Sequence, residues 1–422
     1  IQNFLRRVEE SLKSFLVPGM LFEELGFRYF GPIDGHNLPE LISTLDRIKD
    51  LKTPALLHIL TKKGKGMVST NTENNDYYLD AVKFHAVKPN GGIKSNIENN
   101  NPTPIKAPIF QDVFGSIVCE IARNRKDTVC ITAAMREGTG LVPYAKEFKD
   151  RYYDVGIAEG HGVTFAAGLA TQNVRPIVAI YSTFLQRAYD HIIHDAAIQH
   201  LPVVFCMDRS GIAGEDGPTH HGALDIAYLK CIQGMIVTAP KDGNELRHLL
   251  YTALDYSDGP FSIRYPKASS ESFDEKGQAE LLPIGSWEVC RKSDGNTVIL
   301  AVGPQVFDGI RAAENLSQKG IECEVVNCRF IKPMDIGYLQ SISDRFDQVI
   351  IIEEGVKTGS FGESVAAFLA TKRYKGIIKT ISLPDEFVEH GPRDLLLEKW
   401  GVNQKGIEEV ILNENKTVKL QY

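Results

Sequence analysis

The sequence lacks any uninterrupted apolar run of about 18 residues, the length that a membrane-spanning helix requires. We therefore expect a soluble protein with no membrane partner. The opening residues, IQNFLRRVEESLK, alternate charged and apolar side chains, so they lack the apolar segment of a secretory signal. They also begin with Ile rather than Met. Export is not indicated.

The seven cysteines form no CxxC pair, and their odd number and wide spacing do not fit a disulfide framework. We expect reduced thiols, mostly in cores, and a cytoplasmic location. An excess of positive charge is also lacking, because 47 Lys and Arg stand against 54 Asp and Glu, for a net charge of −7. This balance argues against a nucleic-acid partner, so any anionic ligand must be bound by local cations.

What the chain has is ordinary globular composition: 422 residues, 43% of them hydrophobic and 24% charged, with 36 Gly and 20 Pro. At roughly 150 residues per domain, this length allows about three domains. Two polar stretches without apolar periodicity, 88–108 and 267–283, are predicted as linkers. We therefore expect three parts, at 1–105, 106–270 and 271–422.

Short β-branched runs alternate with helical patterns in the second and third parts, which predicts an α/β fold of parallel sheets flanked by helices. The predicted strands are 128–132, 152–158, 175–181, 201–207, 234–239 and 260–265, then 297–302, 323–328, 348–354 and 376–383. The first part shows helical patterns and one convincing strand, 54–61, which is too little for a complete sheet. We interpret it as the end of a domain that begins elsewhere.

Ligands of open parallel sheets bind beyond the carboxyl ends of the strands, so polar residues that follow strands are candidates. Glu159 follows a strand and starts a helix, where the helix dipole stabilises a carboxylate. It is either a simple helix-start carboxylate or a group that hydrogen-bonds a cofactor ring. Tyr181, Phe184 and Arg187 follow the next strand. An aromatic ring beside a guanidinium suits a planar, anionic ligand, although on these residues alone core packing of the ring and a surface ion pair for Arg187 are favoured.

The segment after the strand 175–181 is predicted as a single helix that carries Arg187, His191 and His194, and further polar residues follow the next strand. His191 and His194 lack a third ligand nearby, so a polar helix face is favoured over a metal site. The Gly-rich segment 206–225 has the length and position of a site loop, or of a turn-rich connection with solvated charges. Its candidate residues are Arg209, Asp216 and His220. The basic turn TKKGKG, 61–66, is a weak phosphate signal on its own.

Several motifs occur in order along nearly the whole chain. They are GPIDGH (31–36), TKKGKG (61–66), FHAV (84–87), AAMREGTG (133–140), AEGHGVTFAAGLA (158–170), AIYSTFLQRAYD (179–190), DRSGIAGEDGPTHHG (208–222) and SIRYPK (262–267). Together they resemble the 1-deoxy-D-xylulose-5-phosphate synthase family, thiamine diphosphate enzymes of the transketolase-like superfamily. The resemblance implies the remaining part of a diphosphate-binding domain in 1–105, a pyrimidine-binding domain in 106–270, and a transketolase C-terminal-like domain in 271–422.

The resemblance also implies an activity. The family condenses pyruvate with D-glyceraldehyde 3-phosphate, with loss of carbon dioxide, through a thiamine diphosphate ylide. This transferase reaction is the first step of the non-mevalonate isoprenoid precursor pathway. Glu159 would contact N1′ of the aminopyrimidine and promote formation of the ylide. Phe184, Met67 and Lys63 would be the other cofactor contacts, and a homodimer is expected.

The remaining roles are likewise implied by the resemblance. The residues implied to hold the substrate phosphate and carboxylate are Tyr181, Arg187, Arg209 and Arg264. His85, His220 and Asp216 would line the reacting centre, and the two imidazoles are the predicted proton carriers, because imidazole titrates near neutrality.

The chain departs from the family pattern in three places. The Gly-Asp-Gly motif that binds Mg²⁺ and the diphosphate is absent, so no metal ligand is assigned and the ligands are expected upstream of Ile1. Met67 stands where an aromatic residue is common, which predicts an apolar cofactor contact. Gly160 replaces the expected Gln, which should loosen polar contacts near the cofactor ring.

Three hypotheses remain. The leading one is a synthase whose first portion, missing from this sequence, is needed as a partner for catalysis. The second is a transketolase fragment or a β-type subunit of a 2-oxo acid dehydrogenase, which naturally lacks the diphosphate motif. YSTFLQRAYD and the segment 31–87 argue against such a subunit. The third is a non-catalytic interaction protein that retains the same fold.

Overall fold

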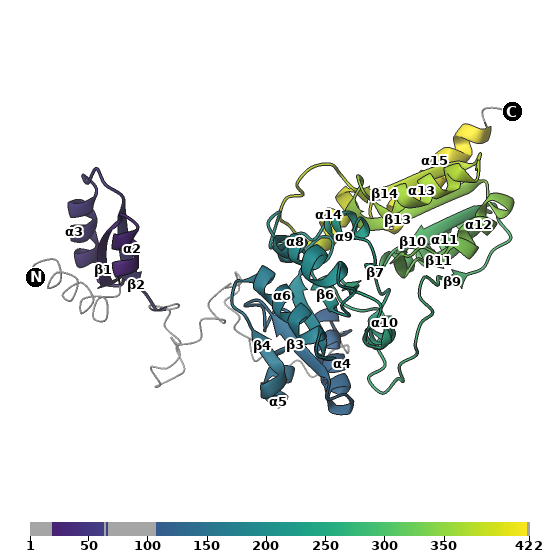
Figure 1. Ribbon diagram of the computed structural model, residues 1–422. Helices are drawn as coiled ribbons and strands as arrows, with labels where there is room; N and C mark the ends of the chain where they lie inside the picture. The colour runs from purple at the N-terminus through teal and green to yellow at the C-terminus, as the bar shows by residue number, and fades with distance from the viewer. Residues whose placement is uncertain (1–18, 63–64, 66–106, 420–422) are drawn as a thin grey trace, which may run out of the picture. The chain divides into compact units, whose positions relative to one another are not determined.

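The computed structural model describes residues 19–62, 65 and 107–419, and the chain divides into two compact units, 1–102 and 103–422 (Figure 1). Each unit is a separate body with its own sheet or sheets. Within the described ranges, no helix has both the length and the apolar content needed to cross a membrane.

The described part of the first unit is a small layer of two strands and two helices. Its elements are α2 (Met20–Glu24), β1 (Arg28–Asp34), α3 (Leu38–Ile48) and β2 (Ala55–Leu60). β1 and β2 run parallel, and their register shifts between Phe30 and Ile33. Only the second strand was predicted from the sequence. β1 was missed because it contains Pro32, and proline is rare inside a regular strand; the shift in register falls at this residue.

The second unit begins with a seven-stranded sheet of order β12-β7-β8-β6-β5-β3-β4. The bounds are β3 Thr128–Thr132, β4 Tyr152–Asp154, β5 Arg175–Tyr181, β6 Val204–Asp208, β7 Ile236–Thr238, β8 Phe261–Arg264 and β12 Phe330–Lys332. All neighbours are parallel except β12 and β7. Each strand predicted within 106–270 overlaps an observed one, which confirms the parallel α/β arrangement there.

Strand β12 joins this sheet from the third predicted part of the chain. It pairs antiparallel with β7, Phe330 opposite Thr238 and Lys332 opposite Val237. Trp287 fixes it further by donating its indole N–H to the carbonyl of Phe330 at 2.8 Å. The sequence did not predict β12, because three residues are too few to show a strand pattern.

The second sheet of this unit has five strands in the order β14-β13-β10-β11-β9. The bounds are β9 Glu288–Arg291, β10 Thr297–Ala301, β11 Cys323–Asn327, β13 Gln348–Val356 and β14 Ile377–Leu383, with only β9 antiparallel to its neighbour. Alternate side chains of β10 enter two cores: Val298 and Leu300 join the core shared with the seven-stranded sheet, and Ile299 and Ala301 join a second one.

Helices cover both sheets, and Figure 1 shows α11, α12, α13 and α15 around the five-stranded one. The helical bounds are α4 Phe110–Asn124, α5 Val142–Glu147, η2 Lys149–Arg151, α6 Glu159–Ala170, α9 Asp225–Lys230, α10 Gly243–Asp255, α11 Gln305–Ser317, α12 Ile336–Arg345, α13 Phe361–Thr371, α14 Arg393–Lys399 and α15 Gln404–Lys419. The segment between β5 and β6 is irregular and belongs to the candidate site.

We expect Gly115→Ala to destabilise the protein, although alanine favours helices over glycine by about 1 kcal/mol. A Cβ at this position of α4 would lie 2.3 Å from the carbonyl oxygen of Gly140, a backbone atom that cannot move aside. The free energy of unfolding in a urea titration should fall by roughly 1–3 kcal/mol. Gly337→Ala in α12 is the control, because its Cβ would meet only a carboxylate oxygen of Asp335, at 3.4 Å. An equal loss in both variants would contradict the steric account.

Candidate active site

The candidate residues gather at the carboxyl ends of neighbouring parallel strands. β5 ends at Tyr181 and β6 at Asp208, and these two residues are paired in register. β4 ends at Asp154, shortly before Glu159 starts α6. Because parallel strands present their carboxyl ends at one edge, the segments that follow β4, β5 and β6 meet there.

Glu159 is the first residue of α6, and its side chain is only 3% exposed. Its Oε1 accepts a hydrogen bond from Nη1 of Arg187 at 2.5 Å, forming a charge-assisted ion pair. Oε2 has no hydrogen-bond partner among the described residues. The dipole of α6 also favours negative charge at this end. The carboxylate is therefore fixed through one oxygen and retains the other for a ligand that donates a hydrogen bond.

The segment between β5 and β6 forms several short turns, contrary to the single helix that the sequence predicted. They are α7 (Ser182–Leu185), the 3₁₀ turn η3 (Gln186–Ala188), α8 (Tyr189–His191) and the π-helical turn η4 (Ile192–Ala197). In the π turn, the N–H of Ile198 donates to the carbonyl of Ile193, five residues earlier, at 2.9 Å. The changes in winding alter the direction of successive side chains, and Arg187 reaches Glu159 from the 3₁₀ turn.

His191 packs against the start of α6. A Cβ at position 160 would lie 2.7 Å from Cε1 of His191, so Gly160 makes room for the imidazole ring. The Nδ1 atom of His191 is buried and has no hydrogen-bond partner in the described part of the chain. His194 instead lies 2.9 Å from the carboxylate of Asp190. In this chain the His191 ring occupies the space that a side chain at position 160 would need, which explains why Gly stands there in place of the expected Gln.

Two aromatic rings and two guanidinium groups form a continuous stack. The rings of Tyr181 and Phe184 stack with their centroids 5.7 Å apart and an angle of 20° between their planes. Cζ of Arg209 lies 3.8 Å from the Tyr181 centroid, and Cζ of Arg187 lies 4.8 Å from the Phe184 centroid. His220 meets the Phe184 ring edge-on at 5.2 Å. The stack joins aromatic surface to fixed positive charge, which suits a planar ring and an anion.

Close backbone approach holds this stack in place. A Cβ at Gly138 would lie 1.6 Å from the hydroxyl oxygen of Tyr181, and one at Gly222 would lie 2.4 Å from Oγ of Ser182. The Ser182 hydroxyl donates to Oδ2 of Asp225 at 3.0 Å, which fixes the start of α7. Burial is the main reason that the pKa of Tyr181 rises to about 12, so its hydroxyl stays protonated at neutral pH.

The loop after β6 carries Asp216 and His220. Oδ2 of Asp216 accepts a hydrogen bond from Nζ of Lys267 at 2.6 Å. Burial opposes ionisation of Asp216, but Lys267 and the neighbouring cations outweigh it and lower the pKa of the carboxyl. Burial lowers the pKa of His220 despite the opposing charge of Asp216. The imidazole is therefore largely neutral near pH 7 and able to accept a proton.

Arg264 lies outside the stack. Its Nε donates to Oδ2 of Asp225 at 3.0 Å, and its Nη2 donates to the carbonyl of Glu354 at 2.8 Å. The carboxylate of Glu354 in turn binds Nη2 of Arg393 at 2.6 and 2.8 Å. Arg264 therefore connects the two sheets of the second unit, and its contact with substrate stays a prediction.

The predicted site residues thus fall into three groups. The structure brings six of them into one connected set: Glu159, Arg187, Phe184, Tyr181, Arg209 and His220. Asp216 lies in the adjoining loop, and Arg264 faces the other sheet. Lys63, Met67 and His85 lie outside the described residues, so their roles stay predictions.

Sequence reasoning missed two of the carboxylates that hold the predicted arginines. Asp208 and Asp225 are both fully buried and accept hydrogen bonds from Arg209 and Arg264. A signal for Asp208 was present, because a carboxylate that ends an apolar strand directly before an arginine needs a buried partner. Asp225 carries no such local signal, since its partner lies far away in the sequence.

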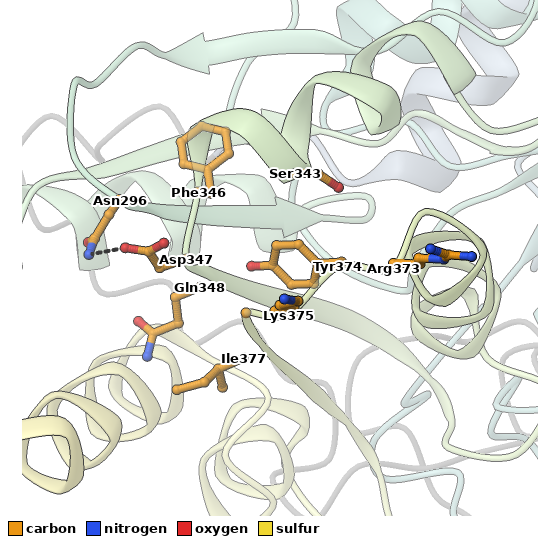
Figure 2. Close-up of a pocket in the computed structure, with 10 residues that line it drawn as sticks. Asn296, Ser343, Phe346, Asp347, Gln348, Arg373, Tyr374, Lys375 and Ile377 are labelled. Carbon is orange, nitrogen blue, oxygen red and sulfur yellow. Dashed lines mark hydrogen bonds between the residues drawn. The ribbon is translucent and has the colours of Figure 1, made fainter. Parts of the chain in front are cut away.

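A separate cavity of about 600 Å³ lies at the amino ends of β10, β13 and β14 (Figure 2). Nδ2 of Asn296 donates a hydrogen bond to Oδ2 of Asp347 at 3.1 Å. Figure 2 shows this pair on one side of the cavity, with Tyr374, Lys375 and Arg373 toward the other side. None of the predicted site residues lines this cavity. Because ligands of parallel sheets bind at the carboxyl ends of strands, the candidate active site stays at the carboxyl ends of β4, β5 and β6 in the seven-stranded sheet.

Three regions of the chain match known families. Residues 106–271 match the transketolase pyrimidine-binding domain, and residues 285–407 match the transketolase C-terminal domain. Residues 1–61 match the family described as 1-deoxy-D-xylulose-5-phosphate synthase. The three-part division predicted from the linkers stays a prediction.

Curated relatives carry the same family name. The chain is 46% identical over 413 residues to 1-deoxy-D-xylulose-5-phosphate synthase of Aquifex aeolicus, covering 97% of this chain and 63% of that protein. It is 44% identical over 408 residues to 1-deoxy-D-xylulose-5-phosphate synthase 1 of Geobacter sulfurreducens, covering 96% of this chain and 62% of that protein. The chain thus spans less than two thirds of the length of these relatives.

Solved structures confirm the predicted fold class. A split-gene transketolase, described as an inactive beta4 tetramer, aligns with a TM-score of 0.63 at 24% identity over 73% of this chain and 98% of that chain. A transketolase variant from Pichia stipitis aligns with a TM-score of 0.61 at 17% identity over 73% of this chain and 46% of that chain. At these identities the likeness shows the fold alone.

We expect Gly160→Ala and His191→Ala to be strongly coupled. Alone, Gly160→Ala places its Cβ 2.7 Å from the His191 ring and should lower the free energy of unfolding by roughly 1–3 kcal/mol. In the His191→Ala background the same change should be neutral or stabilising, since alanine is the better helix former. A double-mutant cycle in urea measures the coupling. Additive effects of the two substitutions would contradict the contact.

Arg187→Ala should destabilise the protein because it leaves the Glu159 carboxylate buried without its partner. We expect the free energy of unfolding to fall by roughly 1–3 kcal/mol, the cost of an unsatisfied buried polar group. Arg123→Ala provides the control, because its pair with Glu147 is exposed and should contribute under about 1 kcal/mol. Thermal and urea unfolding measure both variants. Equal losses of stability would show that the buried pair of Glu159 contributes no more than an exposed ion pair.

Proposed function

Because the chain belongs to the 1-deoxy-D-xylulose-5-phosphate synthase family, we propose that it supplies the pyrimidine-binding and C-terminal parts of a thiamine diphosphate-dependent transferase. The proposed reaction joins pyruvate to D-glyceraldehyde 3-phosphate with loss of carbon dioxide and yields 1-deoxy-D-xylulose 5-phosphate. The observation that carries the proposal is the buried, half-paired carboxylate of Glu159 beside the stack of Phe184, Tyr181 and Arg209.

The described residues fit the aminopyrimidine end of thiamine diphosphate. Oε2 of Glu159 is available to accept a hydrogen bond at N1′, and Phe184 offers a ring for stacking. When bound, the cofactor supplies the nucleophilic carbon that attacks the keto group of pyruvate and takes up the electrons left when carbon dioxide departs. Glu159 holds the proton at N1′, and Arg187 keeps the carboxylate in its place at the start of α6.

Cations at the same edge suit the two anionic substrates. Arg209 keeps Nη2 free of protein partners in the described part of the chain, and the Arg187 side chain is 55% exposed. Both therefore have donors left for the phosphate of the aldehyde or the carboxylate of pyruvate. His220, neutral near pH 7 and in contact with Phe184, is the group that accepts and returns a proton at the reacting centre.

Other parts of the proposal concern residues and partners beyond those described. Mg²⁺ and the diphosphate would be bound by residues upstream of Ile1, with Lys63, Met67 and His85 completing the cofactor and substrate contacts. The active protein would be a cytoplasmic homodimer. A transketolase activity is supported by the matched transketolase domains and by the common fold, but not by the family match of residues 1–61.

The direct test is an assay of the complete natural protein that contains this chain. Pyruvate, D-glyceraldehyde 3-phosphate, thiamine diphosphate and Mg²⁺ are supplied, and the product is identified by NMR. We expect 1-deoxy-D-xylulose 5-phosphate. Ketol transfer from xylulose 5-phosphate without decarboxylation would favour a transketolase, and cofactor binding without turnover of either substrate pair would favour the non-catalytic hypothesis.

Glu159→Gln should abolish the exchange of the thiazolium C2 proton of bound thiamine diphosphate and leave the protein folded. The amide keeps the size of the side chain but does not hold a proton as the carboxylate does. Exchange into deuterated water is followed by NMR, and far-ultraviolet circular dichroism reports the fold. Glu147→Gln, an exposed glutamate on α5, is the control. Exchange at the wild-type rate in Glu159→Gln would refute this role.

A further inference from the structure

We propose that Asp208 is a positioning residue whose carboxylate fixes the guanidinium of Arg209 against the Tyr181 ring and directs its free nitrogen toward the phosphate of an aldehyde phosphate. The identity of the ligand rests on the proposed function, whereas the contacts do not. Asp208 is the first residue of the motif DRSGIAGEDGPTHHG, but the resemblance implies no role for it, and it is not among the residues proposed to touch substrate or cofactor.

Arg209 is held in an unusual backbone conformation. Its φ is +60°, a left-handed value that costs energy for a residue with a Cβ and therefore requires compensating contacts. Its side chain supplies them, because Nη1 donates to the carbonyl of Gly138 at 2.7 Å and to Oδ1 of Asp208 at 2.8 Å. The guanidinium is thereby pinned over the Tyr181 ring, with its side chain only 10% exposed.

These contacts determine which donors of Arg209 remain. Both hydrogens of Nη1 are used, and Nε is buried without a partner among the described residues. Nη2 has no protein partner in the described ranges, and it is not among the buried unpartnered atoms. The accessible donor of Arg209 is therefore Nη2, on the same stack as Phe184 and His220.

Among the described residues, the side chain of Asp208 accepts hydrogen bonds from Arg209 alone. It is the last residue of β6, has no exposed surface, and uses Oδ1 alone, since Oδ2 has no hydrogen-bond partner in the part of the chain described. Burial raises the pKa of Asp208 to about 7, with Arg209 and then Lys267 acting in the opposite direction. A buried carboxylate without a partner would be strongly unfavourable, so Asp208 and Arg209 depend on each other.

Two phenols complete the surroundings of the carboxylate. The hydroxyl of Tyr265, from the end of β8, is buried without a partner in the described chain, and its pKa is raised by burial and then by Asp208. Tyr181, from β5, is likewise affected by Asp208. The charged groups that act on the carboxylate from the packed elements are thus Arg209 and Lys267, and both phenols stay neutral near pH 7.

The first experiment is kinetic and compares Asp208→Asn with Asp208→Ala in the complete protein. Asn keeps an oxygen that accepts from Nη1, so its KM for D-glyceraldehyde 3-phosphate should change less than about threefold. Ala releases the guanidinium, and the same KM should rise about tenfold or more, as expected for loss of a charge-assisted contact. The KM for pyruvate and the kcat should change little in either variant.

Two controls separate positioning from general damage. Asp242→Ala removes another buried aspartate, the N-cap of α10, and should lower stability without raising the KM for the aldehyde phosphate selectively. Use of unphosphorylated D-glyceraldehyde should be unaffected by Asp208→Ala. A parallel rise in both Michaelis constants, or an equal effect of Asn and Ala, would overturn the proposal.

The second experiment tests the pair of Asp208 and Arg209 by measuring the free energy of unfolding at different pH values, without an activity assay. Because the pKa of Asp208 is raised above its ordinary value of 3.8 in the folded protein, the folded state holds more protons between about pH 4 and about 7. Wild-type stability should therefore fall relative to Asp208→Asn as the pH rises through this window and then level off. In an Arg209→Met background the fall should extend to higher pH, because the cation that opposes the effect of burial on this pKa is gone. The same pH dependence with and without Arg209 would overturn the buried pairing.

The two experiments fail in different ways. If the complete protein makes no 1-deoxy-D-xylulose 5-phosphate, the proposed function fails, and the unfolding series still decides whether Asp208 and Arg209 form the pair. If the enzyme is active but Asp208→Ala leaves the KM for D-glyceraldehyde 3-phosphate unchanged, the positioning role fails and the proposed function stands.

Discussion

The ion pair between Glu159 and Arg187 is the interaction on which the candidate site depends. A carboxylate that is 3% exposed needs a partner, and the partner must come from the segment after β5. The 3₁₀ turn of that segment brings Arg187 to the start of α6. The short helix α7, directly before this turn, places Phe184 under the Arg187 guanidinium and against Tyr181. The need to pair the buried carboxylate of Glu159 thus determines where both the Arg187 guanidinium and the Phe184 ring lie.

The arrangement also shows how an acidic protein concentrates positive charge locally. Cations close the stack at both ends, Arg187 on Phe184 and Arg209 on Tyr181. Each guanidinium is fixed through part of its donors by a buried carboxylate, Glu159 or Asp208, and retains others. A side chain that is already immobilised loses little conformational entropy when an anion arrives, so pairing with acids does not prevent the arginines from binding one.

The sequence predicted the strands well because buried parallel strands are short β-branched runs between helical patterns. Glu159, Tyr181 and Arg209 each lie at or after the end of a predicted strand, which predicted that they share one edge of the sheet. The structure places them at that edge. Three features could not be predicted from the sequence, because they depend on distant contacts or on local winding of the backbone. They are the carboxylate that holds Arg264, the π turn, and β12. The sequence also provided no hint that Gly160 accommodates His191, because only packing of two helical segments reveals that contact.

The antiparallel edge strand β12 has a consequence for how the second unit comes apart. Residues 267–283 contain no helix or strand, yet β12, which lies beyond them in the chain, returns to hydrogen-bond with β7. After a single protease cut in that stretch, the two fragments would therefore stay associated through the hydrogen bonds between β12 and β7. A recombinant piece ending there would instead expose the unpaired amides and carbonyls of β7, an open sheet edge that invites self-association.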